Sequence, residues 1–382
     1  MGKKILIGIL VLIILLVANV PNKEKVRVTS SSVIETIALV ETVDNSEIRS
    51  NGLSCIGFQN VSVKILDKPY QNLRLGAINQ LNGQVDYDQV YKVGDKIIIG
   101  LQLKDGMILQ ARTIELYRQG WLGWMFLVFI ISVLIYAGFI GIKALVSFVA
   151  SLAIIWSVLI KGLLNGVEPL LITSVTVVLL SSLIIFLVTG FTKRGLSAFL
   201  GTLIGLLVTM LLTVFFGFRM GLMGLTQPYV QNLFISGYHH LDYREIFYAA
   251  IILGASGAAM DIAVDISAAI HEIKIHNPEI ETKALMQSGF NVGKQVIGTM
   301  ATTLLLAYSG SYLTLLMLFL SKDTSLVRML NLKIVSGEIM RTIIGSIGLV
   351  LVAPATALIS SVLENDVFAT RKKQEEKKLI EV

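Results

Sequence analysis

The stretch WLGWMFLVFIISVLIYAGFIGIKALVSFVASLAIIWSVLI, Trp121 to Ile160, decides the fold class, because Lys143 is its only charged residue. As one straight α-helix it would be roughly 60 Å long. That is about twice the hydrocarbon core of a bilayer, which is roughly 30 Å thick. We therefore expect two membrane-spanning helices here, with the break between Gly138 and Lys143.

The whole chain has the composition of a membrane protein. Of its 382 residues, 54% are hydrophobic and 15% are charged, and the mean hydropathy is +0.75. Further apolar runs lie at residues 5–20, 167–190, 195–217, 246–270, 296–320 and 341–362. They predict an α-helical polytopic membrane protein with about eight transmembrane helices. The first run also resembles a signal-peptide core, but no small-x-small cleavage pattern follows Val17, which favours an uncleaved anchor.

Residues 22–118 have a different character, with charges, short alternating segments and turn signals at Asn51-Gly52, Asn82-Gly83 and Asp105-Gly106. This pattern predicts a small all-β extracytoplasmic domain, and the strand count suits a small barrel of the OB type. Residues 90–103 and 104–116 read as a hairpin. The predicted domains are an N-terminal anchor (1–21), the β domain (22–118), a seven-helix transmembrane domain (119–364) and a basic cytoplasmic tail (365–382).

The basic residues predict the orientation. Lys3 and Lys4, Lys143, Lys193 with Arg194, the loop containing Lys274 and Lys283, and the tail from Arg371 all fall on one side of the predicted helices. By the positive-inside rule that side is cytoplasmic, so both termini are cytoplasmic and residues 22–118 lie outside. These charges follow the ends of apolar runs and form no continuous face, so we expect no nucleic-acid partner. A single cysteine, Cys55, excludes an intramolecular disulfide.

Two acids interrupt the apolar segment GASGAAMDIAVDISAAIHEI, Gly254 to Ile273. Asp261 and Asp265 share one helix face with Gly254 and Gly257. Each charged aspartate at mid-bilayer costs roughly 2.5–3.5 kcal/mol, so this face should meet protein, water or a cation, or else the acids should be protonated. The functional hypothesis is a cation or proton site, and the alternative is a structural acid bonded to a hydroxyl or lysine. The opposite positions, Leu253, Met260 and Val264, suit lipid or other helices.

The next apolar run carries a matching set of polar residues. Lys294 lies at its mouth, at a depth comparable to Asp265, where the two could pair. The polar stretch Tyr308 to Tyr312 then interrupts the run, which is typical of an unwound segment lining a cavity. The alternative is that the hydroxyls bond to their own helix. The predicted transport pathway or ion site comprises Asp261, Asp265, Gly254, Gly257, Lys294, Thr299, Thr302, Thr303, Ser309 and Gly310.

Three apparent motifs are excluded. GFNVGK, Gly289 to Lys294, lacks one residue between its glycines, and Gln295 follows where a phosphate loop has Ser or Thr. The histidines of HEIKIH, His271 to His276, are five apart and diverge by about 140° on a helix. His239-His240-Leu241-Asp242 reads as a solvated loop. We therefore predict no catalytic residues, no metal ligands, no cofactor and no enzymatic activity.

Three sequence blocks appear in order: REIFYAAIILGASGAAMDIAVDISAAIHEI from Arg244, NPEIETKALMQSGFNVGKQVIGTMATTLLLAYSGS from Asn277, and GEIMRTIIGSIGLVLVAPATALIS from Gly337. Over roughly residues 120–365 the chain resembles the YibE/F-like family of bacterial multipass membrane proteins. The resemblance implies a location in the bacterial cytoplasmic membrane. The third block contains Glu338 and Arg341, an expected ion pair at the outer end of the last helix, with Arg244 or Glu245 as alternative partners.

Two functional hypotheses of different classes remain. The first is a permease or ion-coupled transporter of unknown substrate, with its pathway between the acid-bearing helix and the threonine-rich run. The second is a membrane scaffold or accessory subunit that binds a partner through the extracytoplasmic β domain. The expected partners are the lipid bilayer and either a second copy or another membrane protein. An intramembrane hydrolase ranks third, because two acids on one helix form no two-sided dyad.

Overall fold

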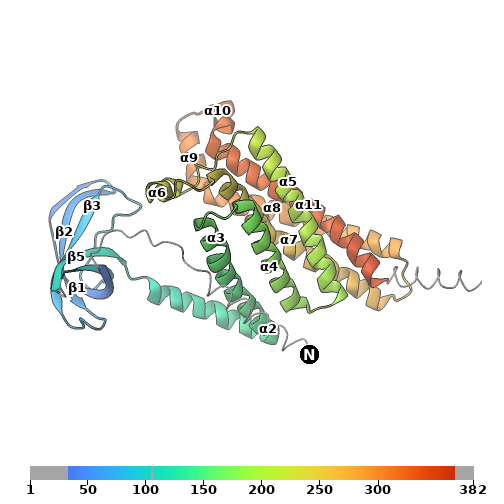
Figure 1. Cartoon of the computed structure of the whole chain (residues 1–382), viewed down its shortest axis with the longest axis horizontal. Helices are drawn as coiled ribbons and strands as arrows, with labels where there is room; N and C mark the ends of the chain where they lie inside the picture. The colour runs from blue at the N-terminus through green and yellow to red at the C-terminus, as the bar shows by residue number, and fades with distance from the viewer. Residues whose placement is uncertain (1–32, 105–106, 366–382) are drawn as a thin grey trace, which may run out of the picture. The chain divides into compact units, whose positions relative to one another are not determined.

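The computed structural model describes residues 33–104 and 107–365, which form two compact units (Figure 1). Of the described residues, those up to Tyr136 belong to one unit and those from Ala137 onward belong to the other. The predicted N-terminal anchor and most of the basic tail lie outside the described residues.

The first unit contains a closed five-stranded barrel. Its strands are β1 (Val33–Asn51), β2 (Ser54–Ile65), β3 (Arg74–Asn82), β4 (Lys96–Lys104) and β5 (Met107–Leu116). They close in the order β1-β2-β3-β5-β4, and all neighbours are antiparallel except β3 and β5. Alternate residues of each strand point inward, so Val61, Val63 and Ile65 of β2 are all buried. The predicted small barrel and the β4–β5 hairpin are confirmed.

A polar network lies inside this barrel. Gln59 is fully buried, and its amide donates to Asn45 Oδ1 and to the Tyr91 carbonyl, each at 2.8 Å. Its oxygen accepts hydrogen bonds from the Tyr91 backbone N–H and from Asn79 Nδ2, each at 3.0 Å. The Thr113 hydroxyl donates to Asn79 Oδ1. These bonds hold the segment before β4 against the barrel and satisfy polar groups that would otherwise be costly to bury.

Helix α2 (Gln119–Ile154) crosses the boundary between the two units. Its backbone leaves the helical conformation at Gly138, where φ is 52° and ψ is −125°. The break in the helix therefore lies at Gly138, the first residue of the interval from Gly138 to Lys143 in which the sequence predicts it. The chain then continues through the π-helical turn η1 (Ile155–Ile160) into α3 (Lys161–Leu164).

The remaining helices form the bundle of the second unit. They are α4 (Pro169–Thr189), α5 (Lys193–Arg219), α6 (Val230–Ile235), α7 (Tyr243–His276), α8 (Thr282–Ser311), α9 (Leu313–Ser321), α10 (Leu326–Asn331) and α11 (Lys333–Glu364). Two helices begin well before the apolar runs that predict them. Helix α8 begins at Thr282 although its run begins at residue 296, and α11 begins at Lys333 although its run begins at residue 341. In the part of the chain that is described, five helices are long and apolar enough to cross a membrane, or six if α8 and α9 form one bent span.

Helix α7 is the centre of this bundle. It contacts α4, α5, α8 and α11, and 61% of its most apolar segment is buried, more than in any other of these candidate spans. Its first turn is capped by Asp242, whose carboxylate accepts from the backbone N–H groups of Arg244 and Glu245. The core therefore surrounds most of the acid-bearing helix.

Helices α5 and α11 lie side by side and pack through small residues (Figure 1). A Cβ on Gly205 would lie 2.1 Å from Val352 Cγ2, and one on Gly348 would lie 2.0 Å from Thr209 Oγ1. Only glycine allows backbones to approach so closely, as in the small-residue interfaces of membrane helices.

Candidate functional site

The predicted acidic face of α7 exists as one continuous exposed stripe. Gly254, Gly257, Asp261 and Asp265 are all exposed, at positions separated by three and four residues. We call these four residues the α7 stripe. The residues on either side of it, such as Ala255, Ile262 and Ile266, are buried in the core. A helix that is otherwise buried thus presents one acidic face outward.

Lipid and other helices were the two expected neighbours of the opposite face of α7, and the second is confirmed. Met260 is buried, and Leu253 and Val264 are half-buried against the same core, so all three contact other helices of this chain. The reason is that α4, α5, α8 and α11 surround α7 with apolar side chains. Apolar residues fill this interior, while the acids point to the one face that no helix of residues 33–104 and 107–365 covers.

The two acids of the stripe have no partner of opposite charge among the described residues. Asp261 and Asp265 take part in none of the hydrogen bonds or ion pairs found there. The suggested Asp265–Lys294 pair is not formed. Lys294 instead lines a groove of about 380 Å³ between α8 and α11, next to Val350 and Pro354. One residue earlier on α8, Gly293 is buried against Ile266 and Ala353, which turns Lys294 toward α11.

The threonines of α8 are exposed and bond to their own helix. Thr299 donates to the Val296 carbonyl at 3.0 Å, and Thr303 donates to the Thr299 carbonyl at 3.0 Å. Thr302 reaches the Gly298 carbonyl at 3.4 Å. The hydroxyls therefore satisfy their hydrogen bonds within α8 and do not point to a cavity between helices. One close contact joins the two helices at the stripe, because a Cβ on Gly254 would lie 2.8 Å from the Tyr308 hydroxyl oxygen.

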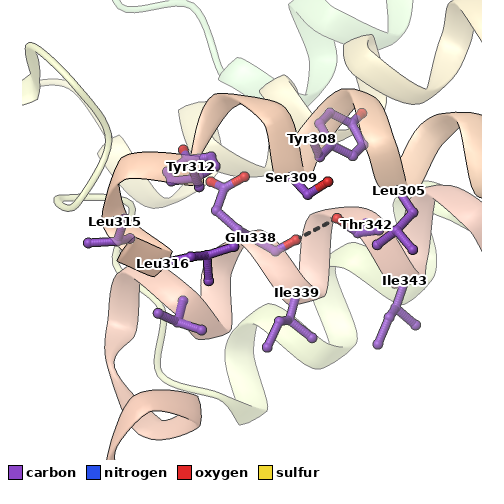
Figure 2. Close-up of a pocket in the computed structure, with 11 residues that line it drawn as sticks. Leu305, Tyr308, Ser309, Tyr312, Leu315, Leu316, Glu338, Ile339, Thr342 and Ile343 are labelled. Carbon is purple, nitrogen blue, oxygen red and sulfur yellow. Dashed lines mark hydrogen bonds between the residues drawn. The ribbon is translucent and has the colours of Figure 1, made fainter. Parts of the chain in front are cut away.

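The predicted unwound segment is reduced to one residue, because residues 308–311 are helical and only Tyr312 separates α8 from α9. Helix α8 stops at Ser311 and α9 starts at Leu313, with a bend of 65° between them. Figure 2 shows the pocket beside this bend, with Tyr308, Ser309 and Tyr312 above residues of α11. Gly310 is exposed, and no atom lies within 4 Å of the position of an added Cβ.

Glu338 and Arg341 form the ion pair that their spacing favours, rather than pairs with Arg244 or Glu245. Arg341 Nη1 donates to Glu338 Oε2 at 3.2 Å, and Arg341 Nη2 donates to Gln227 Oε1 at 2.7 Å. Arg341 also lies over the Phe247 ring, 5.7 Å from its centroid. Glu338 is only 9% exposed. Sequence reasoning missed Gln227, which lies in a loop before α6 and has no periodic pattern to mark it.

Beyond these residues, the polar end of α7 is structural. His271 Nδ1 lies 2.9 Å from Glu364 Oε1, which joins α7 to the end of α11. Asn365 Nδ2 donates to Thr282 Oγ1 at the start of α8. Within the described ranges no group of three His, Cys, Asp or Glu side chains could hold a metal ion.

The apolar helices of this bundle suggest a location in a membrane. The model of the YibE/F-like protein family matches residues 125–366. The chain therefore belongs to the YibE/F-like family, and the match covers α3 to α11 and most of α2. A search of curated proteins finds no match, and neither does a search of solved structures.

Proposed function

We propose that this protein is a multispan permease whose pathway runs along the α7 stripe. The observation that carries the proposal is that Asp261 and Asp265 are exposed on a helix whose other faces are buried. A charged carboxylate in contact with lipid is unfavourable by several kcal/mol. Water, a cation or protein must therefore cover this face in the membrane. A pathway for cations or protons would bring water and cations into contact with the two carboxylates.

The second wall of the pathway comes from another copy of the chain. Helix α8 does not supply this wall, because Tyr308 packs against Gly254 and the α8 threonines bond to their own helix. No other helix covers the stripe within the described part of the chain. Gly257, with no neighbouring atom within 4 Å of an added Cβ, allows the backbone of a second copy to approach closely. A symmetric dimer about α7 would place two sets of acids along one water-filled path.

Flux through reconstituted protein tests the proposal. Asp261→Asn keeps the shape of the side chain and removes its charge, so proton or cation flux into liposomes should fall on the order of tenfold, as expected when a charge-assisted contact is lost. Asp323→Asn is the control, because Asp323 is exposed in the loop after α9 and has φ 46°, which asparagine also adopts. Equal flux of protons and of every cation tried in the two variants would remove the basis of the proposal.

Cysteine chemistry tests what covers the stripe. A Cys55→Ser background has no other cysteine, and Gly257→Cys places a thiol where no atom lies within 4 Å. A water-lined path predicts reaction with a membrane-impermeant maleimide, and a dimer predicts disulfide-linked pairs under mild oxidation. A thiol that reacts in neither assay would indicate contact with lipid and would contradict the proposal.

A scaffold or accessory subunit is the second candidate, favoured by exposed apolar residues on the barrel. At the β1–β2 hairpin, Leu53 is 88% exposed, Ile56 is 58% exposed and Phe58 is 45% exposed. Such a patch is typical of a protein-binding surface. Deleting residues 24–117 discriminates between the candidates: retained flux supports the permease, whereas loss of a co-purifying partner with no flux in either form supports the scaffold.

A further inference from the structure

We infer that the groove between α8 and α11 binds one anionic glycerophospholipid, whose phosphate pairs with the Lys294 ammonium group. Residues of these two helices alone line the groove, and Lys294 is the only charged residue among them. The groove contains none of the residues of the α7 stripe, so the inference does not depend on the proposed pathway.

Close packing of small residues forms the floor of the groove. A Cβ on Gly289 of α8 would lie 3.0 Å from Ala357 Cβ, and one on Gly293 would lie 3.2 Å from Ala353 Cβ. These glycines therefore bring α8 directly against the small side chains of α11. Larger side chains beside this contact form the apolar walls, namely Phe290, Ile297, Val350 and Pro354.

The size of the groove suits a lipid chain better than a partner helix. Its volume is about 380 Å³, within the roughly 300–1,000 Å³ range of small-molecule sites. Two turns of an α-helix about 10 Å wide occupy roughly 850 Å³. Val350 is exposed at the rim, so an acyl chain held in the groove can continue along the surface of α11.

Lys294 is accessible and has no anionic partner on either helix. Its side chain is exposed and takes part in none of the hydrogen bonds or ion pairs found among the described residues. Helix α8 contains no aspartate or glutamate, and α11 has no charged residue between Arg341 and Glu364. Glu364 itself lies 2.9 Å from His271. The negative charge that balances Lys294 therefore comes from outside these helices.

The lining changes from polar to apolar along α8, as a phospholipid does along its length. Gln287 lies at one end of the groove, and Ile297 lies roughly 15 Å further along the helix. Between them, Lys294 lies just before the apolar run that begins at residue 296. A phosphate beside Lys294 therefore places the acyl chains toward Ile297 and the polar headgroup toward Gln287.

The single positive charge of the lining selects an anionic headgroup. A lipid with one net negative charge neutralises Lys294, whereas a zwitterionic lipid brings a positive charge of its own to the site. A ligand without charge would leave the ammonium group unpaired beside apolar walls, which is unfavourable.

Photoaffinity labelling of the full-length protein in phosphatidylcholine vesicles tests the inference. Two probes share the same diazirine-bearing acyl chain, and they carry either a phosphatidylglycerol or a phosphatidylcholine headgroup. We expect the phosphatidylglycerol probe to label the α8 and α11 peptides of the groove about tenfold more, a factor typical of a hydrogen bond to a charged group. Equal labelling by the two probes would overturn the anionic class.

Substitutions of Lys294 test its role. Lys294→Gln should abolish the preference for phosphatidylglycerol, and Lys294→Arg, which keeps the charge, should retain it. Lys283→Gln is the matched control, because Lys283 is an exposed lysine in the first turn of α8 and lies outside the groove. The same preference in Lys294→Gln and in Lys283→Gln would overturn the pairing with Lys294.

Two further variants and a competitor locate the ligand. Val350→Trp fills the groove and should abolish the labelling, whereas Leu351→Trp, at a similarly exposed neighbouring position outside the groove, should not. Equal labelling of these two variants would overturn the site itself. Inorganic phosphate should displace the probe no more than chloride at the same ionic strength does. Displacement by phosphate alone would assign the groove to a free anion and would overturn the lipid.

Discussion

Three acidic residues of the helical bundle lie in two opposite environments. Glu338 is buried and paired with Arg341, whereas Asp261 and Asp265 are exposed and unpaired among the described residues. A buried ion pair needs good geometry and further hydrogen bonds to offset its desolvation. The hydrogen bond from Arg341 to Gln227 is one such further bond. The exposed acids receive no such compensation from the described residues, and the proposed pathway would supply it through water or a cation.

Tyr91 gives a residue-scale prediction for the barrel. Burial raises the pKa of its phenol above the ordinary value of about 10, and a hydrogen bond with Thr113 offsets part of this shift. The folded barrel therefore holds this proton more tightly than the unfolded chain. Its contribution is complete below pH 10 and is lost as the pH rises through the folded-state pKa.

The measurement is denaturant unfolding of the barrel between pH 8 and pH 12, followed by the methyl NMR signals of Ile97 and Ile99. Stability should decline more steeply above pH 10 in the native chain than in Tyr91→Phe, which has no phenol proton to lose. Parallel curves for the two proteins would show that Tyr91 ionises as easily in the fold as in the unfolded chain.

Helix periodicity made the shared face of Asp261 and Asp265 predictable, since residues four apart must lie on one side. Which side faced the core was not predictable. The stripe is lined by glycine and the opposite side by Leu253 and Met260, and either could pack against neighbouring helices. The apolar side chains of α4, α5 and α11 determine which side of α7 is buried. Their positions in space cannot be predicted from the local sequence of α7.

At the scale of elements, the α5–α11 contact should be the most sensitive to added volume. In Gly205→Ala the new methyl group would lie 2.1 Å from Val352 Cγ2 and 3.2 Å from the Gly348 carbonyl oxygen. Overpacking of this kind costs about 1–3 kcal/mol, enough to outweigh the gain of about 1 kcal/mol in helix propensity. We expect a lower thermal midpoint in detergent.

Gly298→Ala is the matched control, because Gly298 is also mid-helix and no atom lies within 4 Å of the added methyl group. It should leave the thermal midpoint unchanged or raise it slightly. A midpoint for Gly205→Ala at or above that of Gly298→Ala would mean that α5 and α11 can separate without loss.

The apolar runs predicted most helices but misplaced some of their ends. The starts of α8 and α11 contain lysine, glutamine and glutamate, which lower the local hydropathy although the residues are helical. Tertiary contacts stabilise these polar turns, as where Asn365 holds Thr282. The break at Tyr312 was visible in the sequence because serine, glycine and tyrosine interrupt the apolar run.

At the scale of the whole molecule, the barrel and the bundle should respond independently to mutation. Gln59→Met removes the side chain that bonds Asn45, Asn79 and Tyr91, which leaves buried polar groups unsatisfied at about 1–3 kcal/mol each. Amide exchange of Tyr91 and the barrel strands should accelerate by about tenfold or more. Exchange in α5, α7 and α11 should stay unchanged.

Hydrogen-exchange mass spectrometry of the full chain resolves these segments in one experiment. The surface variant Gln80→Met, on the outward side of β3, controls for the substitution itself. Equal acceleration in the barrel and in the bundle would show one cooperative unit and would contradict the division at residue 136.

The backbone conformation of Gly138 decides whether the helical stretch around it can cross a membrane once or twice. Its φ of 52° with ψ of −125° is accessible essentially to glycine alone, and it divides a 46-residue helical stretch, Gln119 to Leu164. This stretch can cross the membrane once or twice. Each later loop lies on opposite sides of the membrane in these two cases. A single methyl group at this α-carbon could therefore invert the sidedness of all that follows.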